Sequence, residues 1–165
     1  MTIKAFGYTK SGKAGVFEWL ETAEPQPGPR DLIVRVKAVS VNPVDVKARA
    51  AATPENGTPR ILGFDAAGVV ERVGNNVTLF SPGEEVFYPD AIDRPGTNVT
   101  LRAVEERIVG RKPTSLSWTD AADLPLTALT AWELLLERTR VSYGAKTAGG
   151  TLGYRAEVAS TPNAG

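Results

Sequence analysis

The stretch Val34–Val70, VRVKAVSVNPVDVKARAAATPENGTPRILGFDAAGVV, decides the fold of this chain. Apolar and basic residues alternate at its start, and with the β-branched residues this predicts a half-buried strand over Asp31–Val41. Pro43 then ends the strand and suits the first turn of a short helix over Val44–Ala50. After a polar loop the stretch enters a second apolar strand, Ala66–Val73. The pattern therefore predicts two buried strands with polar groups at their mouths, as in one wall of a site.

Short strands separated by Gly and Pro turns are expected up to residue 113. They are predicted at Ile3–Tyr8, Val16–Glu21, Glu85–Tyr88, Val99–Val104 and Arg107–Gly110. Strands of this length and spacing are typical of a small barrel or sandwich.

The character of the chain changes after residue 113. Ser117 and Asp120 have the spacing of a capping box and predict a short helix after them. Leu126–Arg138 carries apolar residues at helical spacing and is the longest helix candidate. The last residues, 142–165, are rich in Gly, Ala, Ser and Thr and predict an irregular tail. The expected organisation is a β domain over 1–125, a linking helix over 126–141 and the tail.

Composition excludes several classes of function. The chain has 165 residues, with 19 basic and 19 acidic side chains, so net charge gives no argument for nucleic acid or an anionic membrane. It contains no cysteine and no histidine, which excludes disulfides, Ser-His-Asp and Cys-His mechanisms, and a zinc site with thiolate or imidazole ligands. There is no apolar run of membrane-spanning length and no signal-peptide pattern, so a soluble cytoplasmic protein is the expectation.

Asn42 and Asp45 are the first candidate site residues. Asn offers a donor and an acceptor, and Asp offers a charged acceptor. At the start of a helix the two could face one cleft and hold a polar ring or an ordered water. They are equally common at such a place because they bond to the local backbone, and this alternative stays open.

The run Gly63-Phe64-Asp65-Ala66-Ala67-Gly68 is the second candidate. Its small residues would permit close backbone approach, and Asp65 would stand at the mouth of a strand. A tight turn into a buried strand would need the same glycines. A third glycine-rich run, Ala148–Gly153, is not preceded by a buried strand and is followed by too few residues for a helix and a return strand, so we do not interpret it as a phosphate cradle.

Five fragments occur in a familiar order and at familiar distances. They are SVNPVD at 40–45, LGFDAAGVV at 62–70, SPGEEV at 81–86, RIVGRKP at 107–113 and LPLTALTAWELL at 124–135. Together, over roughly Ile3 to Val141, the chain resembles the medium-chain dehydrogenase/reductase family. It is most similar to the zinc-independent, quinone-oxidoreductase-like branch that is often named zinc-type alcohol dehydrogenase-like.

The resemblance implies a mainly β fold, a GroES-like partly open β-barrel with short helices, and a C-terminal linking helix toward a Rossmann domain that is absent from this chain. It implies NADPH as the cofactor of intact relatives, tight binding of none by this chain, and no zinc. In zinc-dependent members a cysteine ligand stands near Asn42, and a histidine ligand stands within the run that is Gly63-Phe64-Asp65 here.

The resemblance also assigns residues. Asn42, Asp45, Thr127 and Thr130 would lie near the cofactor, with Phe64 and Asp65 in the substrate cleft. No catalytic proton donor can be assigned, because the tyrosine that some quinone reductases carry shortly after the aspartate has no counterpart here.

Two functions remain open at this point. In the first, the chain is the catalytic-domain portion of an oxidoreductase that passes hydride to a quinone or an activated carbonyl, and it is incomplete as it stands. In the second, it is a catalytically silent β-barrel interaction module or a truncated product, and its exposed helix Leu126–Arg138 would favour self-association.

Overall fold

A computed structural model describes the chain except for residues 11, 52–53, 55–57 and 141–165. The chain divides into two compact units, Met1–Leu126 and Thr127–Gly165. The predicted tail, 142–165, and the glycine-rich run Ala148–Gly153 lie outside the described residues.

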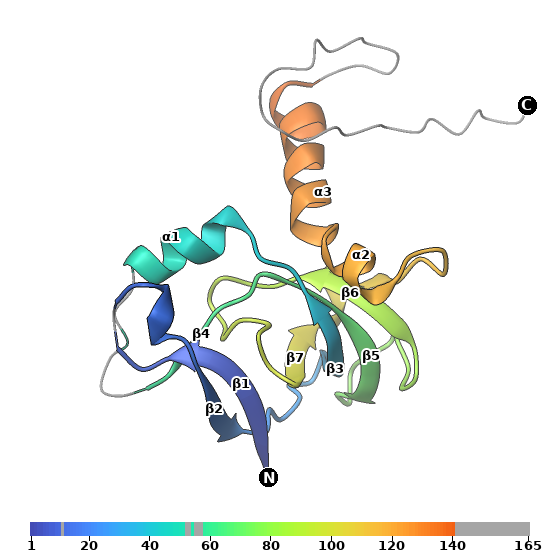
Figure 1. Cartoon of the computed structure of the whole chain (residues 1–165). Helices are drawn as coiled ribbons and strands as arrows, with labels where there is room; N and C mark the ends of the chain where they lie inside the picture. The colour runs from blue at the N-terminus through green and yellow to red at the C-terminus, as the bar shows by residue number, and fades with distance from the viewer. Residues whose placement is uncertain (11, 52–53, 55–57, 141–165) are drawn as a thin grey trace, which may run out of the picture. The chain divides into compact units, whose positions relative to one another are not determined.

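The first unit is built on a five-stranded antiparallel sheet with the order β7-β3-β5-β6-β8. The central strands come from the stretch that decides the fold (Figure 1). The five strands are β3 (Asp31–Val39), β5 (Asp65–Val73), β6 (Glu85–Pro89), β7 (Leu101–Glu105) and β8 (Gly110–Arg111). β3 lies between β5 and β7, so its first half has a neighbouring strand on both sides. This first half is buried on both faces, and the alternation of exposed and half-buried side chains appears only from Arg35 to Val39.

A second sheet has three strands in the order β2-β1-β4. They are β1 (Thr2–Tyr8), β2 (Glu18–Ala23) and β4 (Arg60–Ile61). β1 is also joined to the segment before β7, because Phe6 N–H donates to the carbonyl of Asn98 and Thr100 N–H donates to that of Lys4. The described strands therefore form two connected sheets and do not close into one barrel. The predicted mainly β, partly open architecture is confirmed.

The main hydrophobic core lies on one face of the five-stranded sheet. Side chains from four strands and the loop before β6 pack together there, namely Leu32, Val34, Ala66, Val70, Phe80, Val86, Tyr88 and Val104. Full burial of an aliphatic side chain such as Leu32 contributes roughly 1.5–3 kcal/mol. This core fixes the two strand mouths at which the candidate site residues stand.

Short helices connect the strands. They are η1 (Ala14–Val16), α1 (Pro43–Ala51), η2 (Glu106–Ile108) and α2 (Trp118–Ala122). α1 begins at Pro43, whose fixed φ suits the first helical position. α2 is capped by Ser117, whose hydroxyl accepts from the backbone N–H of Asp120, so the predicted capping interaction is confirmed.

The longest predicted helix is present but is not uniform. α3 (Pro125–Trp132) is α-helical, and η3 (Glu133–Arg138) continues it as a π-helix. Thr139 N–H donates to the carbonyl of Leu134, five residues earlier, which widens the last turns.

One predicted strand is wrong. Residues 107–109 do not form a strand, because the chain turns through η2 and pairs with β6 only at Gly110 and Arg111. The cause is the buried Glu106, whose carboxylate accepts from the backbone N–H groups of Thr78 and Leu79.

Candidate functional site

A buried carboxylate joins the mouths of the two central strands. Asp65, the first residue of β5, has no exposed surface. Its Oδ2 accepts from Asn42 Nδ2 at 2.8 Å and from Ser40 Oγ at 3.1 Å, just beyond the end of β3. Its Oδ1 accepts from the backbone N–H of Leu126 at 2.8 Å, in the first turn of α3. These four residues are called the Asp65 cluster below.

A second carboxylate holds the turn between β3 and α1. Asp45 Oδ2 accepts from the backbone N–H of Asn42 at 2.8 Å, and its Oδ1 accepts from that of Gly63 at 2.9 Å. Asp45 therefore makes the local backbone bond that the sequence left open as an alternative. It also ties the turn to the loop before β5, which brings Asn42 and Asp65 together.

The electrostatics of the Asp65 cluster follow from its burial. Burial raises the pKa of Asp65 above its ordinary value near 3.8, and the hydrogen bonds from Asn42, Leu126 and Ser40 offset part of this rise. The negative charge of Asp45 raises the pKa further. The three donors are neutral groups, so no donor to Asp65 carries a positive charge.

Gly63 shapes the entrance to β5. Its φ is +109°, in the region that favours glycine, and a Cβ there would lie 2.3 Å from Thr97 Oγ1. That hydroxyl is in turn committed, because it donates to the carbonyl of Asp65 at 2.9 Å. The glycine thus permits the close approach of two loops beside the Asp65 cluster.

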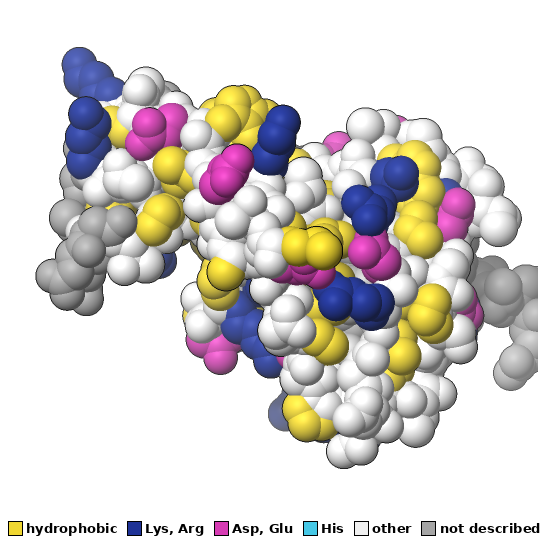
Figure 2. Space-filling view, turned by 90° about the horizontal axis from the view of Figure 1, so that it is seen from below, with side chains coloured by type: hydrophobic (Ala, Val, Ile, Leu, Met, Phe, Trp, Pro, Cys, Tyr) yellow, Lys and Arg dark blue, Asp and Glu magenta, His cyan; other side chains and the backbone are white. Residues whose placement is uncertain are grey.

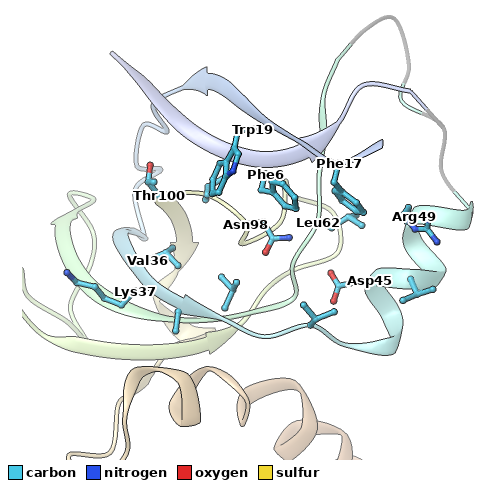
Figure 3. Close-up of a pocket in the computed structure, with 15 residues that line it drawn as sticks. Phe6, Phe17, Trp19, Val36, Lys37, Asp45, Arg49, Leu62, Asn98 and Thr100 are labelled. Carbon is cyan, nitrogen blue, oxygen red and sulfur yellow. The ribbon is translucent and has the colours of Figure 1, made fainter. Parts of the chain in front are cut away.

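A groove of about 660 Å³ opens beside the Asp65 cluster. Three aromatic side chains, Phe6, Phe17 and Trp19, line one wall, and Val36 and neighbouring residues of β3 line the opposite wall (Figure 3). The rings of Phe6 and Phe17 are stacked with centroids 5.5 Å apart, and Trp19 is tilted against Phe6 at 5.2 Å. We call this space the aromatic groove.

Few charged groups lie at the aromatic groove. Lys37, Asp45 and Arg49 are the charged residues that line it (Figure 3). The Asp45 carboxylate is held by two backbone N–H groups, and Arg49 Nη1 donates to the carbonyl of Gly12 at 2.9 Å. The groove is therefore suited to apolar and aromatic groups rather than to a highly charged ligand.

The structure places the predicted site residues in three environments. Asn42 and Asp65 meet in the Asp65 cluster, and Asp45 lies beside it on the edge of the aromatic groove. Phe64 lines a separate recess of about 540 Å³ together with Gly63 and the turn at residues 91–96. Thr127 and Thr130 belong to the second unit, so their predicted place near a cofactor stays a prediction.

Sequence reasoning missed several members of the site. Ser40 stands two residues before Asn42 in the quoted turn, and its hydroxyl could have been counted as a donor. Phe17 and Trp19 are two residues apart on or beside one strand, a spacing that places both side chains on one face. The contribution of Leu126 is a backbone N–H, for which a sequence carries no signal.

The donors of this site do not fit a zinc ion. The chain has no histidine or cysteine, and no group of three acidic side chains in the described part of the chain could hold a metal. The four carboxylate oxygens of Asp45 and Asp65 already accept hydrogen bonds from neighbouring groups. The Asp65 cluster can orient an amide and a hydroxyl, but both oxygens of its carboxylate are already engaged and it offers no thiolate or imidazole to zinc.

Charged side chains of both signs occur on one face of the molecule (Figure 2). On the face shown in Figure 2, basic and acidic side chains are interspersed with apolar ones, in line with a net charge of zero. No helix in the described residues is long and apolar enough to cross a membrane.

Comparison with known proteins identifies the fold and the family. Residues 28–109 match the model of the alcohol dehydrogenase GroES-like domain. A curated relative from Staphylococcus aureus, a zinc-type alcohol dehydrogenase-like protein, is 42% identical over 86% of this chain and 42% of its own length. The chain thus spans less than half the length of that relative.

Solved structures agree. A Rhizobium etli protein named as a zinc-dependent alcohol dehydrogenase superposes with a TM-score of 0.81 and is 48% identical, over 88% of this chain and 44% of its own. An Escherichia coli quinone oxidoreductase solved with NADPH has a TM-score of 0.69 and is 25% identical, over 80% of this chain and 40% of its own. The GroES-like domain, the mainly β fold and these relatives show that the chain belongs to the medium-chain dehydrogenase/reductase family, of which it contains the N-terminal part.

Proposed function

We propose that this chain is the catalytic-domain portion of a zinc-independent, NADPH-dependent oxidoreductase that passes hydride to a quinone or an activated carbonyl. Its relatives are oxidoreductases of one family, and one of them is named a quinone oxidoreductase and was solved with NADPH. A small-molecule substrate and a cytoplasmic location are part of the same proposal.

The observation that carries the proposal is the Asp65 cluster. By resemblance, Asn42 and Phe64 stand where zinc-dependent members place ligands. Here Asn42 is engaged with Asp65 and Ser40 instead, at 2.8 and 3.2 Å. Neutral side chains in those positions favour chemistry in which the protein orients the reactants and the nicotinamide cofactor, when bound, supplies the hydride.

The proposal assigns roles to the chain's own residues. Asn42 and Asp45, with Thr127 and Thr130, would form the cofactor side. Phe64 and Asp65 would belong to the substrate side, Phe64 in contact with the substrate and Asp65 through the side chains that it holds. The aromatic groove, with its wall of Phe6, Phe17 and Trp19, offers the apolar surface that a flat quinone would need.

A titration tests the proposal directly. The purified chain is titrated with NADPH while nucleotide fluorescence is followed, and quinone reduction is then assayed by the loss of NADPH absorbance. Tight binding by this chain is not expected, but any saturable binding or turnover by the wild type would support the proposal and should be weakened in Asn42→Ala. Asn75→Ala, at an exposed asparagine, is the matched control and should bind like the wild type. Flat curves for the wild type would contradict catalysis by this chain alone.

The absence of zinc is tested separately. The chain is incubated with zinc, dialysed, and analysed for bound metal, and the activity assay is repeated with a chelator present. We expect no retained zinc and no change in the assay. One equivalent of retained metal would contradict the zinc-independent assignment.

A second candidate function rests on exposed apolar side chains. In the second unit, Leu129 is 54% and Trp132 is 61% exposed. Such residues favour self-association or a partner chain, so a catalytically silent interaction module is the alternative. Light scattering across a concentration series distinguishes the two: growth in mass without NADPH binding supports the module, and a monomer that binds NADPH supports the oxidoreductase.

A further inference from the structure

The two oxygens of the Asp65 carboxylate hold two different parts of the first unit. Oδ2 holds the turn after β3 through Asn42 and Ser40, whereas Oδ1 holds the first turn of α3 through Leu126. Asn42 and Leu126 are 84 positions apart in the sequence, and they share this one side chain. We propose that Asp65 is a positioning residue that locks the amide of Asn42 to the first turn of α3 and makes Asn42 a hydrogen-bond acceptor toward any ligand.

The bond between Asp65 and Leu126 supplies a hydrogen-bond acceptor that the first turn of α3 lacks. Pro125 and Leu126 are the first two residues of this helix, and the N–H groups of a first turn have no acceptor within their own helix. Asp65 supplies the acceptor for Leu126 at 2.8 Å, and a carboxylate at a helix N-terminus is also favoured by the helix dipole. The start of α3 is therefore fixed by a residue of β5.

The orientation of Asn42 follows from the same carboxylate. Both hydrogen bonds of the Asn42 side chain are donated by Nδ2, to Asp65 Oδ2 at 2.8 Å and to Ser40 Oγ at 3.2 Å. A carboxylate accepts and does not donate, so it selects the orientation that turns Nδ2 toward it and Oδ1 away. With both amide protons engaged, Asn42 has only an acceptor left for a ligand.

The acceptor character of Asn42 has a consequence for the proposed function. The link to a ligand rests on that proposed function. A carbonyl substrate needs a hydrogen-bond donor at its oxygen, and Asn42 cannot be that donor while Asp65 holds it. The ligand group opposite Asn42 should instead carry an O–H or N–H, such as a hydroxyl or a carboxamide. Asn42 would then orient a ligand without polarising its carbonyl.

Asp65→Asn is the informative substitution. Asparagine has the size of aspartate but only one acceptor oxygen, which can stand in the place of Oδ1 or of Oδ2 but not of both, so either Asn42 or Leu126 faces an NH2 group. Amide NMR on the full 15N-labelled chain reports both sites without any cofactor. In the variant we expect the side-chain signal of Asn42 to move, or the backbone N–H of Leu126 to exchange with solvent about tenfold faster or more, as loss of a charged acceptor implies. The exchange of Val70 N–H, bonded to the carbonyl of Glu84 at 2.9 Å, serves as the internal reference.

Two control variants separate positioning from general loss of stability. Ser40→Ala removes a donor to Asp65 and the second acceptor of Asn42, but it leaves the bonds of Asp65 to Asn42 and Leu126 in place, so the Leu126 N–H should keep its protection. Asp90→Asn alters a buried carboxylate that is bonded to Arg102 and not to Asn42 or Leu126. It should lower stability without a specific change at either site.

The outcomes are distinct from those of the proposed function. Unchanged signals at both sites in Asp65→Asn, or the same local changes in Asp90→Asn, would overturn the proposal. A wild-type chain that fails to bind NADPH contradicts catalysis by this chain, but it leaves the NMR result intact. A chain that does bind NADPH should shift the Asn42 side-chain signal on titration, and an unmoved signal at saturation would overturn the acceptor role.

Discussion

Two buried aspartates stand at neighbouring strand ends and are held in opposite ways. Asp65 opens β5, and its register partner in β6 is Pro89, directly before Asp90. Burial raises the pKa of both carboxyls above their ordinary value. Asp90 receives a bidentate cation, with Arg102 Nε and Nη2 at 2.8 and 2.9 Å. Asp65 receives only an amide, a hydroxyl and a backbone N–H.

The two carboxylates therefore have different structural roles. In the Asp90–Arg102 pair each charge depends on the other, and the two side chains are only 1% and 7% exposed. Removal of either partner strands a buried charge. The Asp65 cluster divides its stabilisation among three neutral donors, so one donor can be lost while the others hold. The ion pair secures the fold, whereas the cluster can position groups that must also respond to a ligand.

The largest effect is expected from breaking the ion pair. Arg102→Met leaves Asp90 buried without its cation and should lower the free energy of unfolding by about 3–5 kcal/mol. Urea unfolding followed by circular dichroism measures this. The double variant Asp90→Leu/Arg102→Met removes both charges and should recover most of the loss. A single variant that costs under about 1 kcal/mol would mean that water already reaches Asp90.

An added side chain at Gly63, at the entrance to β5, should lower stability more than one at a glycine in an open turn. Gly63→Ala forces a Cβ to 2.3 Å from Thr97 Oγ1 at a φ of +109°, and we expect a loss of about 1–3 kcal/mol or more. Gly83→Ala is the matched control, because its φ is +93° but no atom lies within 4 Å of the added Cβ. The difference between the two unfolding energies isolates the crowding beside the Asp65 cluster, and equal losses would contradict that crowding.

A single donor to Asp65 should matter less. Ser40→Ala removes one of the three hydrogen bonds to Asp65, together with the longer bond from Asn42 to Ser40, and is expected to cost about 0.5–1.5 kcal/mol. Ser81→Ala, at an exposed serine, should change the unfolding energy little. If Ser40→Ala lowered the free energy of unfolding nearly as much as Arg102→Met, the Asp65 cluster would depend on a single partner as strictly as the ion pair does.

The smallest expected effect is a change with pH in the stability difference between the wild type and Asp65→Asn. Because the pKa of Asp65 is raised in the folded chain, the folded form keeps a proton that the unfolded form has released. Its contribution to stability is thus complete below the ordinary pKa and weakens as pH rises through the raised pKa. The stability difference between the wild type and Asp65→Asn should therefore shrink as pH rises from about 3 to 6. Unfolding curves across this range measure it.

Glu84 provides the control of opposite sign. Its pKa is lowered, chiefly by the backbone N–H of Ser81. The contribution of Glu84 is present above the ordinary pKa and is lost as pH falls through the lowered pKa. The difference between the wild type and Glu84→Gln should therefore grow with pH. A difference of the same sign for both variants would contradict the contrast between them.

Local patterns predicted much of the fold. The alternation over Asp31–Val41 predicted β3, because a strand with a polar and an apolar face needs a period of two. Pro43 and Ser117 predicted the starts of α1 and α2, because a fixed φ and a side-chain acceptor act within a few residues. These features depend on neighbours in the sequence, and they are confirmed.

Features that depend on distant residues could not be predicted in this way. The strand expected at 107–110 failed because Glu106 is held by N–H groups 27 and 28 positions away. The aromatic groove joins residues near 6, 19, 36 and 99, which no local pattern connects. The spacing of Asn42 and Asp45 did indicate the turn between β3 and α1. That Asp65 holds the turn depends on a contact over 23 positions.

The connections of β1 bear on the order in which the chain is made. β1 pairs with residues 60–61 of β4 and bonds to the segment 98–100, and both of these are synthesised well after it. During synthesis the side chain of Ile3 therefore emerges long before Leu101 and Ala103, against which it packs. Contacts this far apart slow folding and prolong the exposure of apolar surface. The apolar face of the N-terminal hairpin is therefore expected to stay exposed longest while the chain is made.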